Sequence, residues 1–159
     1  HNQGSMPGMN MLVDIGNGTM SILEIHDGRP IENSISTEVF GVHQCMEKIQ
    51  KEVSKHSGVD VSEMLIEPLL RNGIGDRTDA VAMTTKRVAE NYTVEIMKKL
   101  TAHGYREELV HLFIIGGGGC LLKNFFDLTA KSEVTVITDI CANAKGYEAL
   151  AMMKQRMRG

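Results

Sequence analysis

Asp14 and the glycine-rich stretch after it form the first group of residues able to do chemistry. The aspartate ends an apolar run and is followed, two positions later, by Gly16, Asn17, Gly18 and Thr19. Glycines let backbone N–H groups approach an anion, and a carboxylate beside them suits a phosphate with its Mg²⁺. The same residues also fit a tight hairpin turn with a capping aspartate, so this stretch alone leaves both interpretations open.

A run of four glycines, Gly116, Gly117, Gly118 and Gly119, forms the second group. It follows an apolar run and precedes a segment with helical character. A strand, a glycine run and a helix in that order bring backbone amides and a helix N-terminus close to a ligand. Packing a helix against a strand requires only one or two glycines, so four in succession favour a functional role. Cys120 comes next, either as a ligand contact or, more commonly for cysteine, as a small buried side chain.

Several familiar sites are excluded by the residues present. A Rossmann motif would need glycine where Ser21 or Leu121 stands, and the absence of any Gly-Lys pair excludes a P-loop. The six histidines lack the spacing of a metal cage, and no serine lies in a G-x-S-x-G elbow. Three scattered cysteines indicate a reduced, cytoplasmic environment rather than a disulfide framework.

The charge balance and the hydropathy pattern bear on whether the protein binds nucleic acid or a membrane. Seventeen basic against twenty acidic side chains give a formal net charge of −3, without the basic excess expected of a nucleic-acid binder. The glycine run interrupts the longest apolar stretch, so no segment reaches the length of a membrane span. We therefore expect neither a membrane nor a direct nucleic-acid partner.

The elements that position these groups follow from the hydrophobic pattern of the 159 residues, a length typical of one domain. Alternating or continuous apolar residues predict three antiparallel strands at the start, then helices where the spacing becomes helical. The expected strands are 9–15, 19–25, 31–39, 109–115 and 133–138, and the expected helices are 42–53, 61–70, 81–100, 121–128 and 142–156. This order predicts an α/β domain whose mixed sheet opens with three antiparallel strands and has helices on both faces.

Three of these segments together resemble the actin-like ATPase superfamily, whose lobes have a ribonuclease-H-like fold. The hairpin at 14–19 is similar to its second phosphate motif, 112–119 to its adenosine motif, and 142–147 to its second connecting segment. Their order and spacing also fit, and the likeness extends from about residue 9 onward. Within the superfamily, the chain most resembles the bacterial plasmid-segregation proteins of the ParM/StbA type.

The resemblance implies a protein of two lobes that close on one nucleotide, of which this chain is similar to the second, C-terminal lobe. The first lobe carries another Asp-glycine phosphate loop and a segment that positions the attacking water, and neither is recognisable here. Since the chain also does not begin with Met, we expect a lobe of a longer protein over 9–159, after a disordered or expression-derived leader at 1–8. A small helical subdomain is expected at about 38–79.

The resemblance also implies roles for the site residues. Asp14 would hold Mg²⁺ through water, and the amides of residues 16–19 would contact the β- and γ-phosphates of ATP or ADP. The first three glycines of the run, 116–118, would let the chain pass under the α-phosphate and adenosine. Glu67 and Arg71 are candidates for base and ribose contacts from the helical subdomain, although a solvated helix face explains them equally well.

The implied function is Mg²⁺-dependent ATP binding and hydrolysis coupled to self-association into filaments, with a DNA-binding adaptor protein as a candidate partner. Because phosphoryl transfer depends on positioning and charge neutralisation, one lobe alone is expected to bind nucleotide with negligible turnover. The alternative is the C-terminal lobe of a sugar or acid kinase of the same superfamily. A third interpretation is a regulatory lobe that no longer binds nucleotide. The motifs do not distinguish ATP from GTP.

Overall fold

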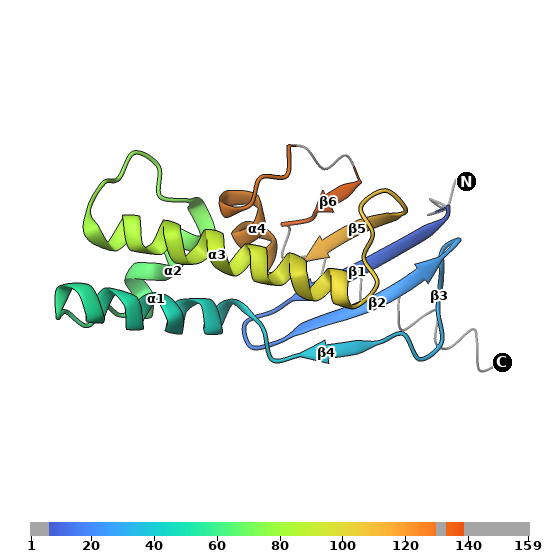
Figure 1. Ribbon diagram of the computed structural model, residues 1–159, viewed down its shortest axis with the longest axis horizontal. Coiled ribbons are helices and arrows are strands. Elements are labelled where there is room, and N and C mark those ends of the chain that lie inside the picture. Colours follow the sequence, from blue (N-terminus) through green and yellow to red (C-terminus); the bar gives the residue numbers. More distant parts are fainter. Residues whose placement is uncertain (1–6, 130–132, 139–159) are drawn as a thin grey trace.

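The computed structural model describes residues 7–129 and 133–138, which form one mixed sheet with helices beside it (Figure 1). The strands and helices follow the hydrophobic pattern of the sequence closely. The strands are β1 (Met9–Ile15), β2 (Met20–His26), β3 (Arg29–Pro30), β4 (Ser36–Glu38), β5 (Val110–Ile115) and β6 (Val134–Val136). The helices are α1 (Val42–Ser57), α2 (Glu63–Asn72), α3 (Ala80–Ala102) and α4 (Gly118–Phe125).

Strand β1 lies at the centre of the sheet, whose order is β3-β2-β1-β5-β6. It runs antiparallel to β2 and parallel to β5, and β5 in turn runs parallel to β6. In this register Asp14 is opposite Ser21 on one side and Ile115 on the other. The carboxyl ends of β1 and β5 therefore meet at the same edge, and so do the two glycine-rich segments that follow them.

The prediction of a single third strand over 31–39 is wrong. Two short strands, β3 and β4, pair with β2 instead, and a turn separates them. The Ser34 hydroxyl donates to the Ile31 carbonyl oxygen at 2.8 Å, and Asn33 has a positive φ of 62°. Asn and Ser readily form such local turns, which compete with the regular ladder of a strand.

The predicted helices at 42–53, 61–70 and 81–100 correspond to α1, α2 and α3. Helix α1 ends at Gly58, whose φ of 67° is the left-handed conformation that favours glycine at this position. Helix α4 begins at Gly118 rather than at residue 121, so part of the glycine run is helical. The helix predicted at 142–156 lies outside the described residues.

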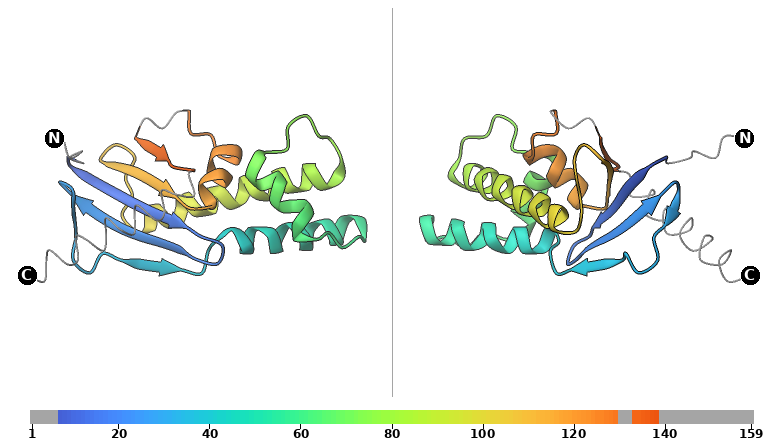
Figure 2. Two further views of the ribbon diagram at one scale, coloured as in Figure 1. Left: turned by 180° about the vertical axis from the view of Figure 1, so that it is seen from behind. Right: turned by 45° about the vertical axis from the view of Figure 1, so that its right-hand side comes forward.

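Helix α3 crosses one face of the sheet, and the view from behind shows β1 and β2 with no described helix over them (Figures 1 and 2). Apolar side chains of β1, β2, β5 and all four helices form one buried cluster, in which Tyr92, Ile96 and Leu100 of α3 are almost completely buried. Helices on one face are thus confirmed, while helices on the second face remain a prediction. Helices α1 and α2, which fall within the predicted subdomain 38–79, extend beyond the end of the sheet (Figure 1).

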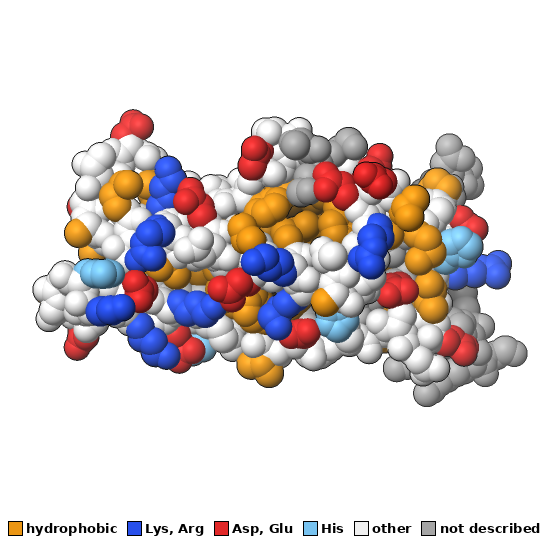
Figure 3. All heavy atoms as spheres, viewed as in Figure 1, with side chains coloured by type: hydrophobic (Ala, Val, Ile, Leu, Met, Phe, Trp, Pro, Cys, Tyr) orange, Lys and Arg blue, Asp and Glu red, His pale blue; other side chains and the backbone are white. Residues whose placement is uncertain are grey.

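Basic and acidic side chains intermingle over α1 and α3 on the face shown in Figure 3. Ion pairs join the two helices, including Lys48 Nζ to Glu95 Oε2 at 2.8 Å and Arg87 Nη2 to Glu52 Oε2 at 3.0 Å. No patch of a single charge dominates this face. Among the helices of the described segments, none is both long enough and apolar enough to cross a bilayer.

Candidate functional site

The parallel pairing of β1 with β5 brings the two glycine-rich segments into contact. Gly116, the first residue after β5, has a positive φ of 86° and lies against the end of β1. A Cβ atom at this position would be 2.5 Å from the Ile15 carbonyl oxygen and 2.6 Å from Asp14 Oδ1. Only glycine permits this approach, because both the φ angle and the space exclude a side chain.

The β1–β2 turn is held by the start of helix α1. The Gly16 and Asn17 carbonyl oxygens accept hydrogen bonds from the backbone N–H groups of Val42 and His43, at 3.0 and 2.7 Å. Within the turn, the Gly16 N–H donates to the Thr19 carbonyl oxygen at 2.9 Å. The Gly16 N–H thus already has an acceptor within the turn, and its expected contact with a phosphate stays a prediction. The N–H groups of residues 17–19 donate to no backbone carbonyl of the described residues.

Gly41, which the sequence analysis did not single out, is what allows α1 to approach the turn. A Cβ atom there would lie 2.4 Å from the Asn17 carbonyl oxygen. The Gly41 carbonyl oxygen accepts a buried hydrogen bond from the Tyr92 hydroxyl at 2.7 Å, and the Tyr92 ring stacks on Phe40 with centroids 4.3 Å apart. Helix α3 thus fixes the position from which α1 starts. A glycine directly before an amphipathic helix was the available sequence signal.

A cavity of about 410 Å³ opens where the turn, the glycine run and α2 converge, a size in the range of small-molecule sites. The view from behind shows the β1–β2 turn beside the start of α1, with α2 and α4 next to it (Figure 2). Five of the residues singled out from the sequence line this cavity together: Asn17, Glu67, Arg71, Gly116 and Gly117. They come from three separate parts of the chain.

The polar lining from α2 consists of an ion pair held in place from α4. Arg71 Nη2 lies 2.5 Å from Glu67 Oε1, and both side chains are more than half exposed. The Asn124 side-chain amide donates to the Leu70 and Arg71 carbonyl oxygens at 3.0 and 2.9 Å. These bonds satisfy carbonyls at the C-terminal end of α2 and fasten that helix beside the glycine run.

Sequence reasoning missed most of the remaining lining, since it depends on tertiary packing. The further lining residues are Val42, Met46, Glu63, Leu70, Cys120 and Thr138. His43 Nδ1 lies 3.2 Å from Glu63 Oε1, which links the starts of α1 and α2 at the cavity rim. Of these residues only Cys120 had been weighed as a contact, from its place directly after the glycine run.

The four positions of the glycine run differ in whether the fold requires glycine there. Gly118 packs against β1, where a Cβ atom would be 2.2 Å from Ile15 Cγ2, and a Cβ atom at Gly119 would be 3.1 Å from Val136 Cγ1. Gly117, by contrast, is exposed and has ordinary helical φ and ψ angles. The nearest atom to a Cβ there would be Val42 Cγ2 at 3.8 Å, so the protein itself does not require glycine at position 117.

The other predicted site residues lie around the cavity rather than in its lining. Asp14 is next to Gly116 at the end of β1, and Gly18 and Thr19 complete the turn. The connecting segment at 142–147 lies outside the described residues. No cluster of three or more potential metal-ligating side chains occurs among the described residues. Asp14 as a single carboxylate fits Mg²⁺, which keeps several waters and takes further ligands from a bound phosphate.

Comparisons with known proteins bear on the family and the fold of the chain. The family model described as "Archaeal actin homologue MreB-like, C-terminal" matches residues 12–127, which is more than half of the chain. The chain belongs to this family of actin homologues. The suspected actin-like relationship and the actin-like α/β lobe are thereby confirmed. No curated protein matches the chain at a significant level.

Solved structures of actin homologues share the fold at low sequence identity. Ta0583, an archaeal actin homologue in complex with ADP, is 18% identical with a TM-score of 0.63, and the match covers 84% of this chain and 45% of that chain. ParM of Bacillus thuringiensis with ATP is 15% identical with a TM-score of 0.63, covering 88% and 44%. A non-polymerisable quadruple mutant of pCBH ParM is 20% identical with a TM-score of 0.68, covering 91% and 47%. The chain thus spans less than half the length of these actin homologues.

Because the space around Gly117 differs from that around Gly118, alanine substitutions at the two positions should affect stability differently. We expect Gly118→Ala to lower the free energy of unfolding by about 1–3 kcal/mol, because Ile15 is fully buried and must move. Gly117→Ala should change it by less than about 0.5 kcal/mol. Urea unfolding of the two variants measures both values. Equal destabilisation would show that position 117 needs glycine for folding.

Proposed function

We propose that this chain is the nucleotide-binding lobe of an actin-like, filament-forming ATPase, with ATP and ADP as its ligands and Mg²⁺ as the accompanying metal. The observation that carries the proposal is that the β1–β2 turn, the glycine run and α2 converge on one cavity. The fold likeness to actin homologues whose structures contain ADP or ATP supports the choice of ligand.

The residues of the chain fit the parts of a nucleotide in a consistent order. The N–H groups of residues 17–19 lie on the side of the turn away from α1, where they suit the β- and γ-phosphates. Gly117 leaves room for the α-phosphate and sugar beside the start of α4, where the helix N-terminus favours an anion. Glu67 and Arg71 would take hydroxyl groups of the ribose and polar atoms of the base.

A bound Mg²⁺ neutralises charge on the phosphates during phosphoryl transfer. Asp14 is the residue of this lobe that would hold it through water, beside the turn. Water positioning is expected from a second lobe, so this lobe alone should bind nucleotide and hydrolyse it at a negligible rate. The plasmid-segregation role of the ParM/StbA type, with a DNA-binding adaptor as partner, is the more specific part of the proposal and is supported by the likeness to ParM.

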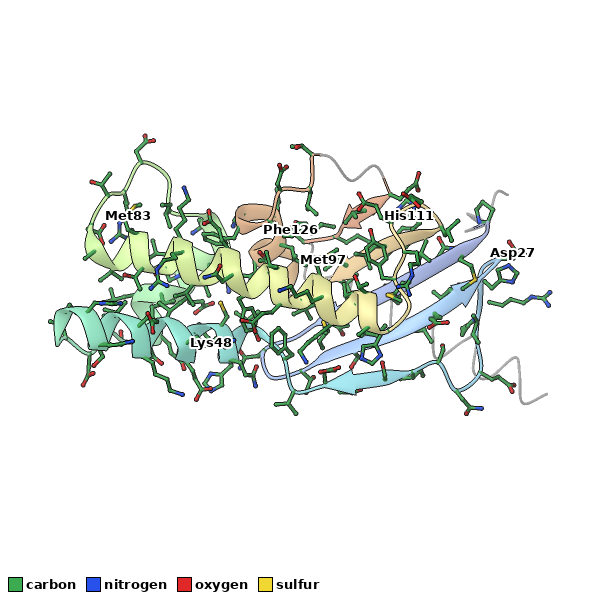
Figure 4. The ribbon with its side chains drawn as sticks, viewed as in Figure 1. Asp27, Lys48, Met83, Met97, His111 and Phe126 are labelled. Atoms are coloured by element: carbon green, nitrogen blue, oxygen red, sulfur yellow. The ribbon has the colours of Figure 1, made fainter. Side chains whose placement is uncertain are left out.

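Titration with a fluorescent ATP analogue and Mg²⁺ tests the proposed site. We expect Asp14→Asn and Gly117→Val each to weaken binding about tenfold or more, because one loses the metal contact and the other fills the ligand's space. Asp27→Asn is the matched control, since Asp27 lies at the opposite end of the β1–β2 pair (Figure 4). Wild-type affinity in both site variants would count against this location.

Protection of Cys120 from alkylation locates the ligand independently. Cys120 lines the cavity and is half-buried, whereas Cys45 is fully buried and its burial raises the pKa of the thiol to about 12. At about pH 8 iodoacetamide should therefore modify Cys120 and leave Cys45 as the protonated, unreactive thiol. Mass spectrometry of the separate peptides should show that Mg-ATP slows Cys120 modification several-fold. Unchanged modification at saturating nucleotide would place the ligand elsewhere.

Nucleotide-dependent sedimentation separates this proposal from the kinase alternative. A protein carrying both lobes should pellet as filaments with ATP and remain in the supernatant with the nucleotide omitted. A sugar or acid kinase would remain in the supernatant in both conditions. The Asp14→Asn variant of the same protein serves as the control for filaments that form without the nucleotide.

A further inference from the structure

The side chain of Gln44 joins the β1–β2 turn to the first turn of helix α1. Its Oε1 atom accepts a hydrogen bond from the Gly41 N–H at 2.7 Å, and its Nε2 atom donates to the Gly18 carbonyl oxygen at 3.1 Å. Gln44 is half-buried and stands three residues after Gly41, the residue before the helix. The first bond caps the helix, as Gln does at this position in other proteins, but the second has no role in capping.

The carbonyls of residues 16–18 all accept hydrogen bonds from α1, and the bond from Gln44 to Gly18 is the third of these. The Gly16 and Asn17 carbonyls are held through the backbone N–H groups of Val42 and His43, which any residue except proline could supply. Among the described residues, the Gly18 carbonyl is held by a side chain and not by a backbone N–H, so this third contact depends on the identity of residue 44. Without that contact the Gly18–Thr19 peptide unit could rotate readily, because glycine has wide conformational freedom.

Fixing a carbonyl also fixes the next N–H. In a planar trans peptide unit the C=O and N–H groups point in opposite directions. The three carbonyls of residues 16–18 point toward α1, so the N–H groups of residues 17–19 point away from it. Gln44 therefore sets the direction of the Thr19 N–H, the last donor in this row.

We propose that Gln44 is a positioning residue for the nucleotide site, which holds the Gly18–Thr19 peptide unit so that the Thr19 N–H can donate to a phosphate. This inference rests on the proposed function for its ligand, while its statement about the turn does not. Gln44 does not line the cavity, and it acts through the backbone of the turn. The same side chain ties the turn to α1, so the phosphate end of the site and the helix that borders the cavity are connected.

Variants of Gln44 and of Gln50 test the proposal. Gln50 lies on the same helix, is also half-buried, and donates from Nε2 to the Val61 carbonyl oxygen at 2.8 Å, away from the turn. Gln44→Met removes two bonds between this side chain and the backbone, one of them the helix cap, and Gln50→Met removes one. We expect both variants to lose thermal stability, Gln44→Met somewhat more, but about tenfold weaker binding of an ATP analogue with Mg²⁺ only for Gln44→Met.

Gln44→Glu separates the cap from the Gly18 contact. Glutamate keeps the acceptor for the Gly41 N–H and is favourable in the first turn of a helix, so stability should be preserved. It removes the donor to Gly18, so the affinity should still fall. Because the added charge also repels phosphate, the neutral Gln44→Met variant must show the same fall. Wild-type affinity in Gln44→Met would overturn the proposal and leave Gln44 as a helix cap.

A measurement without nucleotide distinguishes failure of this inference from failure of the proposed function. We expect ¹⁵N relaxation dispersion to show microsecond-to-millisecond exchange at Gly18 and Thr19 in Gln44→Met and not in Gln50→Met. A rigid turn in Gln44→Met would overturn the positioning role whether or not the chain binds nucleotide. If Gln44→Met shows exchange but the wild type binds no nucleotide, the result would support the role of Gln44 in holding the turn and contradict the proposed nucleotide-binding function.

Discussion

The parallel pairing of β1 with β5 is the constraint on which the rest of the site depends. These strands are separated by three helices in the sequence, yet their carboxyl ends lie at the same edge of the sheet. Each is followed by a glycine-rich reversal of the chain, so the pairing places the two reversals in contact. Gly116 lies directly against Asp14 and Ile15 as a result. Ligands in open α/β sheets commonly bind at such an edge, where the strands end.

Backbone groups rather than side chains make the phosphate end of the candidate site. Backbone N–H groups at the start of α1 donate hydrogen bonds to two carbonyls of the β1–β2 turn, and the Gln44 side chain donates to the third. The first N–H groups of a helix lack partners within the helix, and here the turn supplies acceptors for two of them. In return, the N–H groups of the turn face the other way. One set of hydrogen bonds thus satisfies the helix and orients the turn.

The helical part contributes the other wall of the cavity through equally specific contacts. Asn124 of α4 binds the C-terminal carbonyls of α2, and Tyr92 of α3 binds the Gly41 carbonyl. The ion pair of Glu67 with Arg71 is therefore presented by a helix fixed at its end to the element that carries the glycine run. This pattern fits a lobe in which nucleotide contacts come from both the sheet and the helical subdomain, as we propose.

The sequence by itself determined the order of most of the described strands and helices, the two glycine-rich segments and the actin-like relationship. These are local properties: a hydrophobic period, a turn signal or a row of glycines is expressed within a few residues. It failed where local hydrogen bonding interrupted a pattern, as at Asn33 and Ser34, whose turn stands where the predicted third strand would begin and leaves only β4 of it. It also did not predict that α4 begins within the glycine run.

Only the tertiary structure decided which glycines are needed for close packing of the protein and which leave room beside the cavity. Gly118 is required by Ile15, more than a hundred positions away in the sequence, while Gly117 has no such neighbour. The roles of Gly41, Gln44 and Asn124 likewise depend on partners brought close by the sheet and the helices. The sequence named Glu67 and Arg71 only as candidates, and the fold set them on the same cavity as Asn17 and the glycine run. A local pattern carries no information about such distant neighbours, because their proximity arises only when the whole sheet pairs in register.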